Sequence, residues 1–119
     1  MRYADVERHC LSLPGATLSI QLGADRVFKI GGKMFAVMGP PEARPHTLSF
    51  KASEESFYIL THVDGIIPAP YLARAQWVML ENLRALKDAE ITTYLTRAHA
   101  IVARGLPKKT RAALVIGED

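Results

Sequence analysis

The chain has 119 residues, of which 49% are hydrophobic and 23% charged, a composition that predicts one globular domain over residues 1–119 and excludes a disordered chain. The single cysteine, Cys10, excludes an internal disulfide and argues against a zinc site built on cysteine. The net charge is only +3, no uncharged run could cross a bilayer, and the first residues lack the apolar core of a secretory signal, so we expect a cytoplasmic protein with no membrane segment.

The first elements follow from apolar spacing. Apolar residues recur at every third or fourth position over Tyr3–Leu13, which predicts a helix that stops at Pro14-Gly15. Cys10 lies on the apolar stripe of this helix, which indicates a buried structural thiol rather than a reactive one. The alternating segment Thr17–Gln21 predicts a short strand.

A β-hairpin is predicted next. Arg26–Ile30 and Lys33–Met38 flank Gly31-Gly32, a two-residue loop typical of a type I′ or II′ turn. The simplest register sets Phe28 opposite Phe35 and Val27 opposite Ala36, with a core side that carries Phe28, Ile30, Phe35 and Val37. The other side, here called the second hairpin face, carries Val27, Lys29, Met34, Ala36 and Met38. This face is too apolar for a fully solvated surface, which predicts a cover or a partner.

Lys29 and Lys33 admit two interpretations. Paired β-ribbons can enter a groove of nucleic acid, so both lysines are candidates for phosphate contacts. Lysines also keep an exposed hairpin soluble and prevent unwanted pairing. The residues alone leave both interpretations open.

The remaining elements complete the predicted fold. Thr47–Lys51 alternates as a strand, and Ser53 caps a helix of about two turns. Gln76–Leu80 reads as a strand, with a short extended piece expected at Pro70–Ala73. Asp88 is the expected cap of a long helix that ends at Gly105 and buries Ile91, Leu95, Ala98 and Val102. Because most strands form one block between helices, we predict an α+β fold with a mainly antiparallel sheet of five to six strands.

The C-terminal segment is basic. Between Ile91 and Gly117 every charged residue carries a positive charge, namely Arg97, Arg104, Lys108, Lys109 and Arg111. Such a run is typical of a surface that meets an anionic partner. It also fits a solubilising tail. We expect Leu106–Arg111 to be a proline-interrupted segment with few backbone partners, in which Leu106 packs back and Lys108, Lys109 and Arg111 stay exposed.

No pattern predicts catalysis or a cofactor. The four histidines have no partner at a metal-binding spacing, and Glu54-Glu55 suits a helix start. Gly31-Gly32 joins two strands, so it is not a phosphate loop, and no serine lies in a nucleophile elbow. We therefore expect a protein that is not an enzyme and holds no metal. Trp77, close to Arg74, fits either a core anchor or a stacking platform for a base.

Four motifs together resemble the MmcQ/YjbR family: "LSLPGAT" (Leu11–Thr17), "VFKIGGKMFAVM" (Val27–Met38), "PAPYLARAQWV" (Pro68–Val78) and "GLPKKTR" (Gly105–Arg111). They occur in the family's order over nearly the whole chain. The resemblance implies a fold similar to the frataxin-like CyaY arrangement, with N- and C-terminal helices packed on one face of the sheet in two layers.

The family is usually described as DNA-binding through a proposed double-wing arrangement, and the resemblance implies that activity here. It assigns contacts to the matching positions Lys29, Gly31, Gly32, Lys33, Arg74, Trp77, Lys108 and Lys109. The chain departs from many relatives at Val78, where asparagine is common. A frataxin-like fold would also suggest iron binding, but the first helix offers only Asp5 and Glu7 beside basic residues, which argues against it.

Two functions follow as expectations. The first is a small DNA-binding protein that contacts mainly phosphates, with Lys29, Lys33, Arg74, Lys108, Lys109 and Arg111 as site residues. The second is a non-enzymatic interaction module or homodimer that uses the second hairpin face. The sequence does not decide between a monomer and a homodimer.

Overall fold

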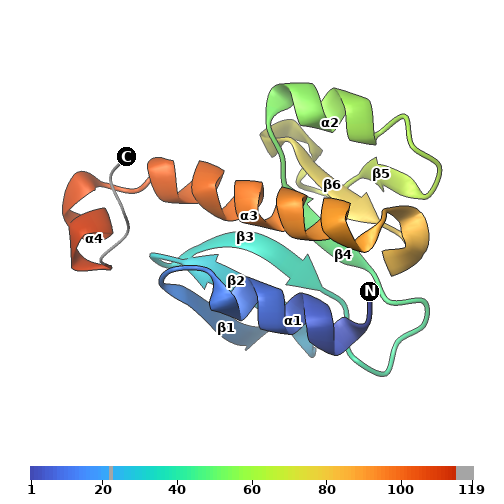
Figure 1. The fold of residues 1–119 in the computed structure, drawn as a ribbon, viewed down its shortest axis with the longest axis horizontal. Helices are drawn as coiled ribbons and strands as arrows, with labels where there is room; N and C mark the ends of the chain where they lie inside the picture. The colour runs from blue at the N-terminus through green and yellow to red at the C-terminus, as the bar shows by residue number, and fades with distance from the viewer. Residues whose placement is uncertain (22, 115–119) are drawn as a thin grey trace.

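A six-stranded antiparallel sheet organises the chain, and the computed structural model describes residues 1–21 and 23–114 (Figure 1). Its strands are β1 (Ala16–Gln21), β2 (Asp25–Ile30), β3 (Lys33–Met38), β4 (Leu48–Lys51), β5 (Ile66–Pro68) and β6 (Trp77–Leu80). They lie in the order β1-β2-β3-β4-β6-β5, and every neighbouring pair is antiparallel.

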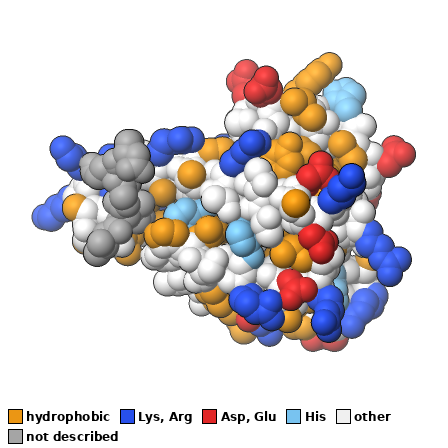
Figure 2. All heavy atoms as spheres, viewed as in Figure 1, with side chains coloured by type: hydrophobic (Ala, Val, Ile, Leu, Met, Phe, Trp, Pro, Cys, Tyr) orange, Lys and Arg blue, Asp and Glu red, His pale blue; other side chains and the backbone are white. Residues whose placement is uncertain are grey.

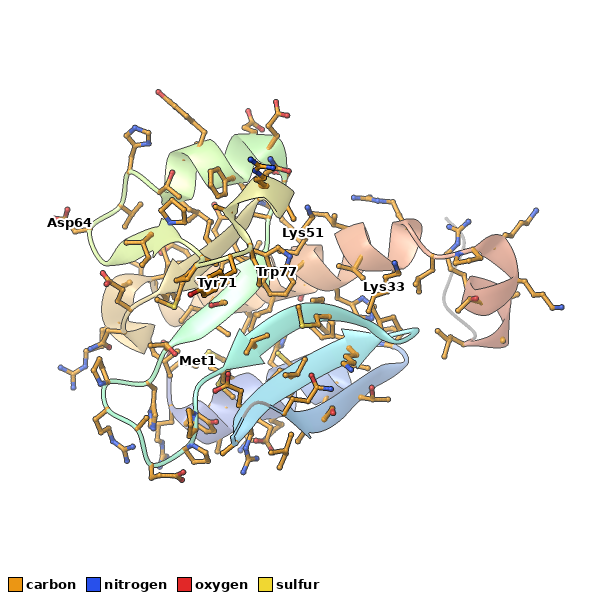
Figure 3. The ribbon with its side chains drawn as sticks, turned by 180° about the vertical axis from the view of Figure 1, so that it is seen from behind. Met1, Lys33, Lys51, Asp64, Tyr71 and Trp77 are labelled. Atoms are coloured by element: carbon orange, nitrogen blue, oxygen red, sulfur yellow. The ribbon has the colours of Figure 1, made fainter. Side chains whose placement is uncertain are left out.

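The helices are α1 (Tyr3–Ser12), α2 (Glu54–Leu60), α3 (Asp88–Arg104) and α4 (Lys108–Ala113), with 3-10 turns at Ala73–Ala75 and Leu83–Ala85. Figure 1 shows α1 and α3 crossing one face of the sheet, which confirms the predicted α+β fold with helices on one side. The opposite face of β1–β4, seen in Figure 3, carries no helix and is called the open face below. No helix within the described ranges is long and apolar enough to cross a membrane.

The core lies between the sheet and the two long helices. Val6 and Cys10 of α1 and Ile91, Leu95 and Ala98 of α3 are fully buried against the strands. Each buried Leu, Ile or Val side chain contributes about 1.5–3 kcal/mol through removal of apolar area from water. The predicted helix stripes are thus confirmed, except that Val102 is only half-buried and Ala103 takes a core position near the helix end.

A β-bulge in the hairpin overturns part of the predicted register. Lys29 faces Met34 as expected, but Phe28 faces Ala36 and Val27 faces Val37, so Phe35 is the additional residue. Phe35 stays in the core, where its ring lies 6.5 Å from Phe28, and the bulge turns Ala36 and Met38 to the same side. A bulge is favoured because it buries three β3 side chains, Phe35, Ala36 and Met38, where strict alternation would bury two. Ala36 and Met38 therefore belong to the core, and Val37 to the second hairpin face.

Local signals explain most element ends. The Ser53 hydroxyl accepts a hydrogen bond from the Ser56 amide at 3.0 Å, so the predicted cap of α2 is confirmed. The N-cap of α3 is Lys87 and not Asp88, so the predicted cap is wrong by one residue. The Lys87 amide donates a hydrogen bond to the Glu90 carboxylate at 3.0 Å. The helix ends at Gly105, as predicted.

Two predictions about irregular segments are wrong. The extended piece lies at Ile66–Pro68 rather than Pro70–Ala73, because an edge strand tolerates the missing amide of Pro68. The segment after Gly105 is not irregular: Pro107 precedes the short helix α4. A proline suits the start of a helix for two reasons. Its φ, here −56°, is already close to the helical value, and the amide that it lacks would have no partner within the helix. Leu106 is buried and Lys108 and Lys109 are exposed, as expected, but Arg111 is half-buried, so the prediction that it stays exposed is wrong.

The two turn glycines of the hairpin provide a matched test of this arrangement. Both have positive φ, +58° at Gly31 and +81° at Gly32, but a Cβ at Gly31 would lie 2.7 Å from Leu106 whereas one at Gly32 would meet nothing within 4 Å. We expect Gly32→Ala to cost about 1 kcal/mol from backbone strain alone. Gly31→Ala should cost about 1 kcal/mol more, because Leu106 must move. Urea unfolding measures both, and equal costs would contradict the packing of Leu106 on this turn.

Candidate nucleic-acid interface

The hairpin turn and α4 meet at one end of the molecule. A Cβ on Gly31 would lie 2.7 Å from Leu106 Cδ1 and 3.3 Å from Thr110 Cγ2. Only glycine at this position of the turn therefore leaves room for the start of α4. At the other side of α4, Leu114 lies 3.6 Å from the Cβ position of Gly15 in the α1–β1 turn. Helix α4 therefore packs on two turns of the sheet layer.

This packing brings Lys33 of the hairpin to the same end as Lys108 and Lys109. All three are exposed, and Arg111 is half-buried with its Nε lacking a hydrogen-bond partner among described residues. Figure 2 shows basic side chains and no acidic ones at the α4 end of this face, and side chains of both kinds over the rest of it. The predicted hairpin and tail residues are thus neighbours, although about 75 positions separate them in the chain.

The strand directions carry further basic residues to this end. Because β4 is antiparallel to both β3 and β6, Lys51 at the end of β4 and Trp77 at the start of β6 face each other, at the strand ends that lie on the same side of the sheet as the hairpin turn (Figure 3). Arg74 is exposed in the 3-10 turn that precedes Trp77, and the Lys51 amine donates a hydrogen bond to the Ala75 carbonyl of that turn. Lys29 lies on the open face opposite Met34.

We call this set the basic end: Lys29, Lys33, Lys51, Arg74, Lys108, Lys109 and Arg111. The structure brings the hairpin turn and α4 together, whereas it places Arg74 beside Lys51 in the turn before β6, on the other side of β4 from the hairpin. Lys51 was missed by the sequence analysis. Its only signal is its position as the last residue of the alternating segment "TLSFK", which says nothing about the neighbouring strands.

The charged groups of the basic end form no ion pairs with other described residues. The three ion pairs among described residues join Arg8 to Asp5, Arg26 to Glu7, and the N-terminal amine to Asp88, and none includes a residue of the basic end. Lys108 and Lys109 lie in the first turn of α4, where no acid accompanies them. Cations at a helix N-terminus oppose the helix dipole, so these lysines do not stabilise α4.

Trp77 is an anchor rather than a stacking platform. Its side chain is 5% exposed, which leaves no ring face for a base. It lies on the open face, opposite Lys51, whereas the next residue, Val78, points into the main core and is fully buried. A position that faces the core cannot make a polar contact with a ligand, which accounts for valine at residue 78.

A hollow of about 310 Å³ adjoins the basic end between the start of α2 and α3. Lys51, Arg97 and Glu55 contribute charges of both signs to its lining. The Arg97 guanidinium lies 5.5 Å from the centre of the Tyr94 ring, whose other neighbour is the stacked ring of Phe50. The cation–π contact holds Arg97 along α3, so the hollow is a polar recess with one acid rather than a purely cationic site.

The remaining polar residues have structural partners. Each histidine ring lies within hydrogen-bond distance of an oxygen: Thr96 Oγ1 for His9 and backbone carbonyls for His46, His62 and His99. The Arg8 side chain lowers the pKa of Asp5 by a hydrogen bond, and Arg26 binds Glu7 at 2.6 Å. The two acids of α1 are therefore already paired, and no cluster of three metal-ligating side chains occurs in residues 1–21 and 23–114.

Cys10 is buried between α1 and the sheet, and this burial raises the pKa of its thiol from 9.0 to about 12. The neutral thiol should react slowly with thiol reagents until the protein unfolds. Because the unfolded thiol ionises first, unfolding becomes easier as the pH rises above about 9, by up to about 1.4 kcal/mol per unit. Parallel denaturation of wild type and Cys10→Ala should show the steeper loss in wild type, and identical slopes would contradict a buried neutral thiol.

Comparisons with known proteins agree with this geometry. The structure is similar to the crystal structure of the Deinococcus radiodurans protein DR2400, which carries the DUF419 domain, with a TM-score of 0.84 and 23% sequence identity over 96% of this chain and 88% of that one. At that identity the likeness establishes the fold. A search of curated proteins gave no significant match. The YjbR family model matches residues 11–101, which include both strands of the hairpin, Trp77 and most of α3. The chain therefore belongs to the YjbR family.

Proposed function

We propose that this protein is a small, non-enzymatic DNA-binding protein that contacts mainly phosphates through its basic end. One observation carries the proposal: the hairpin turn and α4, about 75 residues apart in sequence, meet at one end of the fold, and each brings basic side chains that form no ion pair with another described residue. Unpaired cations placed close together repel one another, so a cluster of them favours an anionic partner.

Phosphates are a better match than base edges. Five of the seven residues of the basic end are lysines, which act as mobile point charges and lack the planar fork that reads guanine. Trp77 of β6 is buried and offers no ring face to a base. Contacts of this type carry no sequence information and fall steeply with salt. We therefore expect weak sequence preference.

The second hairpin face supports a weaker alternative, an interaction module or homodimer. After the bulge, this face consists of Val27, Lys29, Met34 and Val37, because Ala36 and Met38 lie in the core. Val27 is buried by its neighbours, whereas Met34 and Val37 stay half-buried. The apolar surface that motivates this alternative is thus smaller than the sequence predicts, and we place it second.

The DNA proposal is tested by a charge-matched pair of double variants. Lys108→Ala with Lys109→Ala removes two charges from the basic end, and Arg84→Ala with Lys87→Ala removes two exposed charges at the opposite end of α3. Both should leave the free energy of unfolding within roughly 0.5 kcal/mol. Binding to a DNA duplex is measured by fluorescence anisotropy across a salt series that starts at about 50 mM.

The first variant should reduce the slope of log affinity against log salt by about one to two units, since each lost phosphate contact releases one counterion fewer. The control should keep the wild-type slope. Absence of duplex binding by wild type at low salt refutes the proposal. Equal reductions of this slope in both double variants would mean that DNA binding depends on the net charge of the protein rather than on the basic end.

A further inference from the structure

The two edges of the sheet are protected very differently. Strand β5 at one edge has three residues and contains Pro68, two features that prevent a further strand from pairing there. Strand β1 at the other edge has six residues, "ATLSIQ", with no charge, proline or glycine. It pairs with β2 alone among the described strands, so one side of its backbone has no ladder partner. Figure 3 shows β1 at the margin of the sheet.

Apolar side chains accompany this edge. Ile20 is 61% exposed and Leu11 is 41% exposed, and both are among the few large apolar residues of the protein that remain in water. Ile20 and Leu18 point to the side of the sheet that carries the helices, because their partners across β2 are Arg26 and Phe28. An uncharged edge beside exposed apolar side chains is the pattern that natural sheets avoid unless the edge is paired.

We propose that β1 pairs antiparallel with β1 of a second copy of this chain, about a two-fold axis at Ser19. In this register Leu18 lies opposite Ile20 of the second copy, and Thr17 lies opposite its Gln21. Apolar groups thus meet apolar groups on the helix side, and polar groups meet polar groups on the open face. An uncharged strand can pair with itself in this way without placing like charges opposite each other.

The charges on the neighbouring strands do not oppose this register. Lys29 lies beside Thr17, and Asp25 lies beside Gln21. Across the joined sheets, Lys29 of one copy and Asp25 of the other occupy one row, separated by three strand spacings or about 14 Å. The row therefore has opposite charges at its two ends. The antiparallel pairing places the two basic ends at opposite ends of the dimer, away from the paired β1 strands. The proposed dimer therefore does not depend on DNA binding.

Disulfide trapping tests the pairing and its register together. Ser19→Cys places two thiols opposite each other on the axis, where the Cα atoms of paired strands are about 4.5–5.5 Å apart and a disulfide can form. Thr17→Cys is the matched control, because its two copies would lie about 14 Å apart along the strands. Thr17 is the more exposed of the two residues, so random collisions would favour the control. The buried Cys10 takes no part.

We expect Ser19→Cys to form a disulfide-linked dimer at least about tenfold faster than Thr17→Cys under mild oxidation, the ratio that a preformed pair produces over random encounter. Sedimentation of the reduced wild type should show a reversible dimer, and Ser19→Lys should weaken it at least about fivefold by opposing two lysines on the axis. The melting temperature of the variant should match that of wild type at a protein concentration too low for the dimer to form. A wild type that stays monomeric up to about 100 µM, a concentration at which even a weak interface associates, overturns the proposal. Faster trapping of Thr17→Cys overturns the register.

Discussion

The missing side chain at Gly31 is the constraint on which the contact between the hairpin turn and α4 depends. Leu106 occupies the space over the hairpin turn that any Cβ at Gly31 would fill, and Thr110 fits beside it. This contact lies just beyond the end of α3 and holds α4 against the sheet layer. A helix of six residues has little stability of its own in water, so its tertiary contacts hold it in place. The lysines of α4 reach the hairpin because of this contact.

The β-bulge has a complementary role. It allows Phe28, Phe35 and Met38 to fill the core beneath α3, where Phe35 meets the His99 ring edge-on at 5.3 Å. The ring of His99 lies 2.7 Å from the Pro14 carbonyl, which ties α3 to the turn between α1 and β1. The core thus joins the helix layer to the hairpin on one side, while the open face keeps Lys29 and Lys51 toward solvent. The side chains that form the main core and the side chains of Lys29 and Lys51 therefore lie on opposite faces of the same sheet.

The sequence was sufficient for the elements whose ends have local causes. Pro14-Gly15, Ser53 and Gly105 mark boundaries through backbone preference and capping, and the structure agrees at each of them. The bulge was not predictable, because two hairpin registers satisfy the same turn and only core packing selects one. Helix α4 escaped prediction for the same reason, since Leu106 and Leu114 contact residues far away in the chain. Lys51 joins the basic end only through strand order, which no local pattern reveals.

The central claim is that one end of the fold, assembled by the contact between Gly31 and Leu106, is the surface that meets DNA. Backbone amide shifts recorded during titration with a short duplex test it most directly, because they locate binding without any substitution. The account predicts shifts confined to Lys29–Lys33, the residues around Lys51 and Arg74, and the first turn of α4. Shifts centred on α1 or on the exposed face of α2, with the α4 amides unchanged, would contradict it.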